Sequence, residues 1–170
     1  IHAVQANLRF ADSVVRAVEG ADIVINAVGI LAPDGSQTFE AVHAQGARRV
    51  AKAARDTGAR RLVHISAIGA NRKSNSSYAA TKAEGEAAVH AEFPSGIILR
   101  PSIVFGPEDD FFNRFAALAR VSPVLPLIGG GRTKFQPVFV GDVGQATANA
   151  AIDAGTPGAT YEICGPQVVS

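Results

Sequence analysis

The 170-residue chain contains a single cysteine, Cys164, and neither methionine nor tryptophan. One cysteine excludes an internal disulfide, and no cluster of cysteines is present that would hold zinc. The formal net charge is only +1, and aromatic residues make up 6% of the chain. This composition lacks the basic surface and the stacking rings of a nucleic-acid-binding protein. No apolar run reaches the roughly 18 residues of a membrane-spanning helix, so we expect neither a nucleic-acid partner nor a membrane span.

The absence of methionine has a second consequence, because a chain without methionine does not include its own translation start. We therefore expect these residues to belong to a longer polypeptide, whose targeting signals are not visible here. Hydrophobic residues make up 47% of the chain and charged residues 18%. These proportions are typical of a soluble globular domain with a sizeable core, and the single cysteine fits a reducing compartment.

Short apolar segments alternate with helical patterns along the first hundred residues. The expected strands are residues 1–6, 22–29, 61–66 and 96–100, and the expected helices are residues 12–19, residues 37–56 and a helix that carries Tyr78 and ends before Pro94. Asp12 is expected to cap the first helix, and residues 22–29 are too continuously apolar to leave one face wet. Strands of this kind, separated by helices, predict a parallel sheet covered on both faces. The fold class is therefore α/β, a doubly wound, Rossmann-like parallel sheet with ligands at the carboxyl ends of the strands.

The alternation becomes less regular after Pro101. Residues 109–120 form the pattern of an amphipathic helix, residues 123–137 are rich in proline and glycine, and a further helix is expected over residues 142–152. We expect a Rossmann-like domain over residues 1–106 and a small substrate-side lobe over residues 107–170. Within the amphipathic helix, at least one of Phe111 and Phe112 is expected to stay exposed or to cover the ligand cleft.

Candidate functional residues fall at the ends of the predicted strands. The NAVG stretch at residues 26–29 ends one strand, and Gly29 would let the backbone approach a bound molecule closely; a plain strand-to-loop turn is the alternative. Ser66 ends the next strand, where a serine is more often a cap or turn residue than a catalyst. Pro101 fixes an extended exit from the following strand past the same edge.

Tyr78 and Lys82 are four residues apart on a predicted helix, so their side chains share one face. A phenol with a pKa of about 10 is a poor base at neutral pH. A neighbouring ammonium group favours the phenolate and makes proton transfer feasible. Because the same spacing occurs by chance in many helices, two solvated side chains are the alternative interpretation.

The order of these motifs is more informative than any one of them. NAVG, a strand ending in serine, YxxxK and LRPSxVFGP, in that order, resemble the extended branch of the short-chain dehydrogenase/reductase superfamily, the branch of the sugar-nucleotide epimerases and dehydratases. The stretches EDDFFNRFA and GGGRTKFQPVFVGDV resemble one subgroup more closely: the nucleotide-binding accessory subunit of respiratory complex I and its bacterial relatives. The resemblance spans nearly the whole chain.

The resemblance implies a dinucleotide cofactor, NADP or NAD, with NADP favoured by the subgroup. It implies that Tyr78 is the acid/base and that Lys82 binds the nicotinamide ribose and lowers the pKa of Tyr78. Ser66 is the third catalytic candidate. The cofactor-binding positions that it implies are Tyr78, Lys82, Asn7, Leu8, Ala27, Val28, Gly29, Ile65, Pro101, Ser102 and Ile103.

Three departures from the family pattern count against full catalysis. The family usually has a catalytic serine or threonine where this chain has Ala67, and commonly an asparagine where it has His43. The glycine-rich phosphate turn is absent from these 170 residues. We therefore expect about two strands and two helices upstream, and a sheet that is incomplete at its N-terminus.

Two functions stay open at this point. An NAD(P)-dependent oxidoreductase or epimerase would work through Tyr78 and Lys82. A nucleotide-binding accessory subunit of respiratory complex I would instead hold the dinucleotide without turnover and have subunits of that complex as partners. A third interpretation, a redox-sensing regulator that has lost the cofactor, has no specific support in the sequence. We expect a cytoplasmic location, peripheral to the inner face of an energy-transducing membrane if the second function holds.

Overall fold

The structure is a computed structural model that describes residues 2–109, 113, 117–118, 120, 132–153 and 156–170. Its helices are α1 (Ala11–Val18), the π-helix η1 (Glu40–Gly46), α2 (Ala47–Asp56), α3 (Ser77–Glu92) and α5 (Val140–Ile152). Its strands are β1 (Ile23–Asn26), β2 (Arg61–Ile65), β3 (Ile97–Pro101), β4 (Val104–Phe105), β5 (Val138–Phe139) and β6 (Thr160–Ile163). The helices expected around Tyr78 and near the C-terminal end of the chain are both present.

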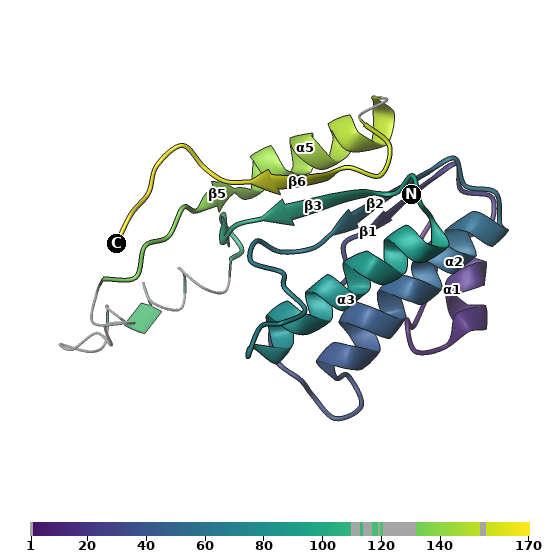
Figure 1. Ribbon diagram of the computed structural model, residues 1–170, viewed down its shortest axis with the longest axis horizontal. Helices are drawn as coiled ribbons and strands as arrows, with labels where there is room; N and C mark the ends of the chain where they lie inside the picture. The colour runs from purple at the N-terminus through teal and green to yellow at the C-terminus, as the bar shows by residue number, and fades with distance from the viewer. Residues whose placement is uncertain (1, 110–112, 114–116, 119, 121–131, 154–155) are drawn as a thin grey trace.

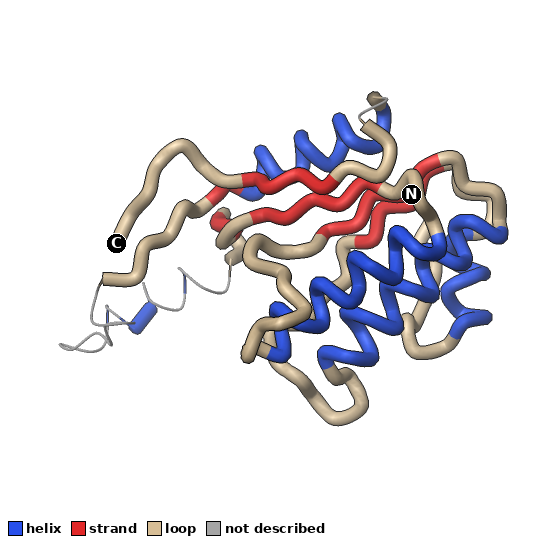
Figure 2. The backbone as a smooth tube through the Cα atoms, viewed as in Figure 1, coloured by secondary structure: helices blue, strands red, loops and turns tan. Residues whose placement is uncertain are grey.

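Four parallel strands form the main sheet in the order β1-β2-β3-β6. Helices α1, α2 and α3 lie on one face of this sheet and α5 lies on the other (Figure 1). The tube in Figure 2 shows the same layers, with the strands in red between two layers of blue helices. Strands β4 and β5 form a separate parallel pair. The predicted α/β fold with a parallel sheet is confirmed.

The helical layer packs closely because small residues face one another across it. Ala51 and Ala54 of α2 have no exposed surface, and both belong to the core cluster that also contains Leu62, Val89 and Phe93. Gly85 of α3 is the closest point of all, since a Cβ atom placed there would lie 2.2 Å from the backbone oxygen of His43 in η1. This close approach brings η1 against α3 and fixes where the candidate site residues of the two helices meet.

Two local expectations are wrong in this structure. Residues 2–6 do not form a strand, because a strand needs a neighbour for its backbone N–H and C=O groups, and no described strand pairs with this segment. Asp12 does not cap α1, which begins after Phe10 without a side-chain cap. Asp12 lies in the first turn instead, where its carboxylate interacts favourably with the positive end of the helix.

The expectation that residues 22–29 have no wet face is also wrong. Along β1, Val24 and Asn26 are buried toward the helices, whereas 36% of Ile23 and 48% of Ile25 is exposed on the opposite face. Helix α5 packs over β2 and β3 rather than over β1, so this face of the edge strand is left open among the residues that the structure describes.

The C-terminal segment joins the main sheet through α5 and through β6, which pairs with β3. The division into residues 1–106 and 107–170 stays a prediction. The predictions for residues 109–120, including the exposure of Phe111 and Phe112, lie largely outside the described residues. None of the helices in the described part of the chain has the length and apolar character needed to cross a membrane.

Candidate functional site

Helix α3 presents three functional side chains to the sheet. Tyr78, Lys82 and Glu86 follow one another at intervals of four residues and therefore share one face of the helix. The helix begins here because the Ser76 hydroxyl accepts a hydrogen bond from the backbone N–H of Ala79, at 3.4 Å. Such a cap satisfies one of the amide groups that the first turn of a helix leaves unpaired. The predicted shared face of Tyr78 and Lys82 is thus part of a longer polar row.

Lys82 is buried, with 5% of its surface exposed. Its Nζ donates a hydrogen bond to the backbone oxygen of Ile65, the last residue of β2, at 3.0 Å. Burial lowers the pKa of Lys82 from 10.5 to about 8, and the neighbouring Glu86 carboxylate partly opposes this effect. The ammonium form therefore predominates at neutral pH, and it has two N–H donors besides the one that bonds Ile65.

The Tyr78 ring contacts two rings that stack on each other, Phe39 just before η1 and His43 within it. The Tyr78 ring meets Phe39 edge-on at a centroid distance of 5.8 Å and His43 edge-on at 5.3 Å. Burial raises the pKa of Tyr78, which is opposite to the lowering by Lys82 that the resemblance implies. In this structure the ammonium of Lys82 bonds the backbone oxygen of Ile65. The phenol of Tyr78 is consequently protonated at neutral pH in this structure.

His43 occupies the centre of the site and is almost completely buried. Its Nε2 accepts a hydrogen bond from the backbone N–H of Ile30 at 3.1 Å, and its Nδ1 lies 3.2 Å from the Thr81 hydroxyl. Because that hydroxyl donates its own proton to the backbone oxygen of Ser77 at 2.7 Å, we assign the histidine proton to Nδ1. Burial and the charge of Lys82 lower the His43 pKa to about 4, so the ring is neutral.

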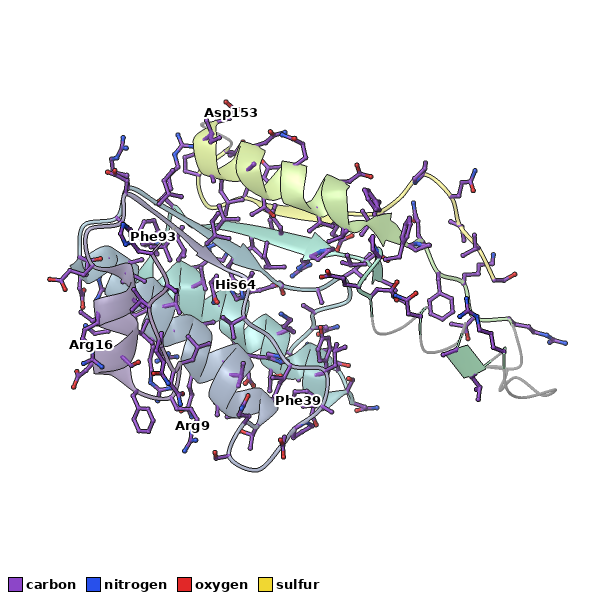
Figure 3. All side chains as sticks on the ribbon, turned by 180° about the vertical axis from the view of Figure 1, so that it is seen from behind. Arg9, Arg16, Phe39, His64, Phe93 and Asp153 are labelled. Carbon is purple, nitrogen blue, oxygen red and sulfur yellow. The ribbon has the colours of Figure 1, made fainter. Side chains whose placement is uncertain are left out.

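The NAVG turn is held by a buried pair of polar side chains. Asn26 Nδ2 lies 3.1 Å from His64 Nδ1, and Asn26 Oδ1 accepts a hydrogen bond from the backbone N–H of Val28 at 3.3 Å. His64 lies between the sheet and the helices (Figure 3), and burial lowers its pKa to about 3. Its Nε2 has no hydrogen-bond partner among the described residues. The position of the turn is therefore fixed by the side chains of Asn26 in β1 and His64 in β2.

Gly29 brings this turn next to the two helices. A Cβ atom placed on Gly29 would lie 3.6 Å from Lys82 Nζ and 3.7 Å from His43 Nε2. A side chain at this position would therefore occupy the space in front of the ammonium group. Glycine keeps that space open to a ligand.

The hydroxyl of Ser66 is committed to a buried ion pair. It donates a hydrogen bond of 2.5 Å to Glu86 Oε1, and Arg100 contacts both oxygens of the same carboxylate at 2.8 and 2.7 Å. Ser66 and Glu86 are both buried. The proton of Ser66 therefore points into the network of β2, β3 and α3, and a ligand would have to compete with a carboxylate for it.

A cavity of about 830 Å³ lies at the carboxyl ends of the strands. Six of the predicted site residues line it: Ile65, Ser66, Tyr78, Pro101, Ser102 and Ile103. Gly29 and Lys82 are not among the lining residues but face each other at the distance given above. Sequence reasoning did not single out Thr81, Glu86 or Arg100, although Glu86 has the same four-residue spacing from Lys82 as Lys82 has from Tyr78.

The predicted adenine-side residues lie apart from this cavity. Asn7 Oδ1 accepts a hydrogen bond from the backbone N–H of Arg9, and the Leu8 side chain packs against Gly46. Ala27 and Val28 are exposed on the NAVG turn. The structure therefore brings together the residues expected around the nicotinamide, and their roles as ligand contacts stay a prediction.

Comparison with known proteins agrees with this arrangement. The family model for the NAD dependent epimerase/dehydratase family matches residues 1–164. The chain belongs to this family.

Two relatives illustrate the range of similar sequences. The chain is 38% identical over 159 residues to the mouse protein NADH dehydrogenase [ubiquinone] 1 alpha subcomplex subunit 9, mitochondrial. The matched region covers 93% of this chain and 42% of that protein. It is 40% identical over 113 residues to a ceramide reductase of Caulobacter vibrioides, covering 66% of this chain and 35% of that protein. The chain thus spans less than half the length of either relative.

Solved structures show the same fold. The DesIV dTDP-glucose 4,6-dehydratase of Streptomyces venezuelae, with NAD and TYD bound, superposes with a TM-score of 0.84 at 23% identity. The superposition covers 96% of this chain and 58% of that chain. NAD is also bound in other structural neighbours.

Proposed function

We propose that this chain supplies the nicotinamide half of an NAD(P)-binding site in a protein that reduces a carbonyl group, with Tyr78 as the proton donor. The observation that carries the proposal is the position of a protonated phenol at the wall of the strand-end cavity, four residues before a buried ammonium. Family membership supports a nicotinamide cofactor. We propose NADP as the preferred form, on the basis of the subgroup resemblance.

The residues present fit the nicotinamide half of such a cofactor. Lys82 has two N–H donors for ribose hydroxyls beside the contact with Ile65. Gly29 leaves the space in front of this ammonium open. Pro101, Ser102 and Ile103 line the strand-end cavity together with Tyr78. When bound, NADPH or NADH would supply the hydride for reduction.

The side chains of this protein would then donate the proton that carbonyl reduction requires. Burial keeps Tyr78 protonated at neutral pH, so it is ready to donate from Oη to the oxygen of a carbonyl group. We propose that the ammonium of Lys82, which predominates below a pH of about 8, turns from the backbone oxygen of Ile65 toward the phenolate left behind and stabilises it. Neutral His43, held by Ile30 and Thr81, keeps the Tyr78 ring in place without adding a second positive charge.

A second candidate is a dinucleotide-binding accessory subunit of respiratory complex I that performs no turnover. The observation that favours it is the hydroxyl of Ser66, which bonds Glu86 instead of facing a ligand, with Ala67 at the position where the family usually has serine or threonine. The name of the mouse relative supports the same assignment. In this case the partners would be subunits of that complex, and the location would be peripheral to its membrane.

Replacement of Tyr78 by phenylalanine in the full-length protein separates the two candidates. With NADPH and a panel of aldehydes and ketones, Tyr78→Phe should abolish carbonyl reduction and leave the dinucleotide Kd within about twofold, because the phenol acts on the proton only. Tyr161→Phe is the matched control, since Tyr161 lies exposed on β6. Equal turnover by Tyr78→Phe and the parent would refute the reductase. A parent that binds NADPH, shows no turnover and co-purifies with complex I subunits would favour the accessory role.

A further inference from the structure

The strand-end cavity continues beyond the proposed nicotinamide contacts into an outer part with apolar walls. The outer wall consists of Leu31, Ile68, Val104, Phe105, Pro107 and Val140. These residues come from four separate parts of the chain: the loop after β1, the loop after β2, the segment around β4 and the start of α5. The whole cavity, including the part beside the proposed nicotinamide contacts, has a volume of about 830 Å³, within the range of roughly 300–1,000 Å³ that small-molecule sites occupy.

Several of these apolar side chains are exposed where the cavity opens. The exposed fractions are 78% for Leu31, 43% for Ile68, 38% for Phe105 and 46% for Val140. The Phe105 ring also packs on the exposed ring of Phe139 at a centroid distance of 5.7 Å. Single exposed apolar residues are common on protein surfaces, but a group of them around one cavity indicates a binding site.

The loop carrying Ile68 is held at the cavity and is not free to fold away. The backbone N–H of Ile68 donates a hydrogen bond to the backbone oxygen of Pro101, the last residue of β3, at 3.0 Å. The position of Val140 is fixed by regular structure on both sides, because it is the first residue of α5 and directly follows β5. The apolar wall is therefore built on the ends of regular elements.

The charges at this cavity are of one sign. The charged residues that line it in the described part of the chain are Glu108 and Asp109, and no lysine, arginine or histidine is among the described lining residues. Asp109 also holds its own loop, since its carboxylate accepts a hydrogen bond from the backbone N–H of Gly106. None of the described lining residues would therefore supply a positive charge to a diphosphate group bound in this part of the cavity.

We propose that the outer cavity binds an uncharged, predominantly apolar molecule that carries a carbonyl or hydroxyl group, and not a sugar nucleotide. The polar end of the ligand would lie at Tyr78, and its apolar part would contact Ile68, Phe105 and Val140. The polar end depends on the function proposed above for Tyr78. The apolar part depends only on the lining of the cavity.

Binding measurements on the full-length protein with NADPH present test this proposal directly. Decan-2-one and dTDP-glucose serve as the apolar and the anionic probe, each titrated by calorimetry. We expect decan-2-one to bind the parent more tightly than dTDP-glucose does. Ile68→Asp and Val140→Asp should each weaken decan-2-one binding about tenfold or more, because each places a carboxylate against an apolar ligand. Ile152→Asp is the control, since Ile152 is 73% exposed and is not among the lining residues.

The outcomes distinguish this proposal from the proposed function. Tighter binding of dTDP-glucose, or equal effects of Ile68→Asp and Ile152→Asp, would overturn the apolar site. Turnover of a dTDP-keto sugar that depends on Tyr78 would keep the reductase and refute the apolar ligand. Binding of decan-2-one with the expected variant effects, but without reduction, would keep the apolar site and refute the reductase.

Discussion

Substitution of Gly85 by alanine tests the packing that positions the site. The new Cβ atom would lie 2.2 Å from the backbone oxygen of His43 and 3.2 Å from its carbonyl carbon. Ordinary carbon–oxygen contacts start at about 3.3 Å, so η1 and α3 would have to separate by roughly 1 Å at this point. Neither atom belongs to a flexible side chain, and the strain therefore falls on two helix backbones.

The expected loss of stability combines two opposing effects. Overpacking of a tight contact costs about 1–3 kcal/mol and occasionally more, whereas alanine in place of glycine inside a helix gains about 0.5–1 kcal/mol. We expect Gly85→Ala to lower the free energy of unfolding by about 1–2 kcal/mol. Since the displaced atom belongs to His43, the variant should also lose affinity for NADPH.

Gly144→Ala provides the matched control, because Gly144 lies inside α5 and a Cβ atom there has no neighbour within 4 Å. This variant should raise the free energy of unfolding by about 0.4–1 kcal/mol and leave NADPH binding unchanged. Urea denaturation of parent and variants under identical conditions measures both effects. Equal stability of Gly85→Ala and Gly144→Ala would show that η1 and α3 are not in tight contact. The position of His43 against α3 would then also be wrong.

Three further predictions concern the buried polar groups. His43 and His64 have folded-state pKa values of about 4 and about 3, below the ordinary value of 6.5, so the unfolded chain binds more protons below pH 6.5 and stability is lost as the pH falls toward 4. Each histidine should lower the free energy of unfolding by about 2 kcal/mol between pH 7.5 and pH 5. In urea denaturation, His43→Asn should remove about half of this pH dependence of stability, and an unchanged pH dependence would contradict a buried, neutral His43 ring. Asn26→Ala removes the contacts of His64 and of the Val28 amide and should cost about 1–3 kcal/mol and weaken NADPH binding, whereas the exposed Asn75→Ala should do neither. Glu86→Ala leaves Arg100 and Ser66 without their shared carboxylate and should cost about 3 kcal/mol; a loss below about 1 kcal/mol in thermal or urea unfolding would argue against the buried pair.

The elements that sequence patterns predicted well are those whose burial is complete. The segment Ile97–Pro101 forms a strand because its apolar run is enclosed by helices on both faces, and α3 begins at a serine cap and ends before Pro94. Residues 2–6 carry a similar pattern but form no strand, because strand formation depends on a paired neighbour that the pattern itself does not reveal. The exposure of Ile25 was also not predictable from the pattern, because it depends on β1 lying at the edge of the sheet.

The candidate site was predictable where its residues are close in sequence. Tyr78 and Lys82 were singled out from their helical spacing together with the order of the surrounding motifs. The contacts of His43 with Ile30 and of Ser66 with Glu86 join residues 13 and 20 positions apart, and such pairs are decided by how the elements pack. The lowering of the Tyr78 pKa by Lys82 stays a prediction; in this structure burial raises that pKa, and Lys82 bonds the end of β2.

The register of one strand decides what Ser66 can do. Ser66 directly follows β2, and its backbone N–H still bonds the Leu99 oxygen of β3 at 2.7 Å. Consecutive side chains of such an extended segment point to opposite sides, so moving a serine by one residue turns its hydroxyl to the other side. At position 67 the side chain lines the strand-end cavity, and here it is the methyl group of alanine. At position 66 the hydroxyl faces α3 and bonds Glu86, which Arg100 already holds in place. The carboxylate that orients Ser66 also withholds its proton from the cavity. We therefore propose Tyr78 as the proton donor at this wall, because its phenol is protonated at neutral pH, which is the state that donation to a carbonyl oxygen requires.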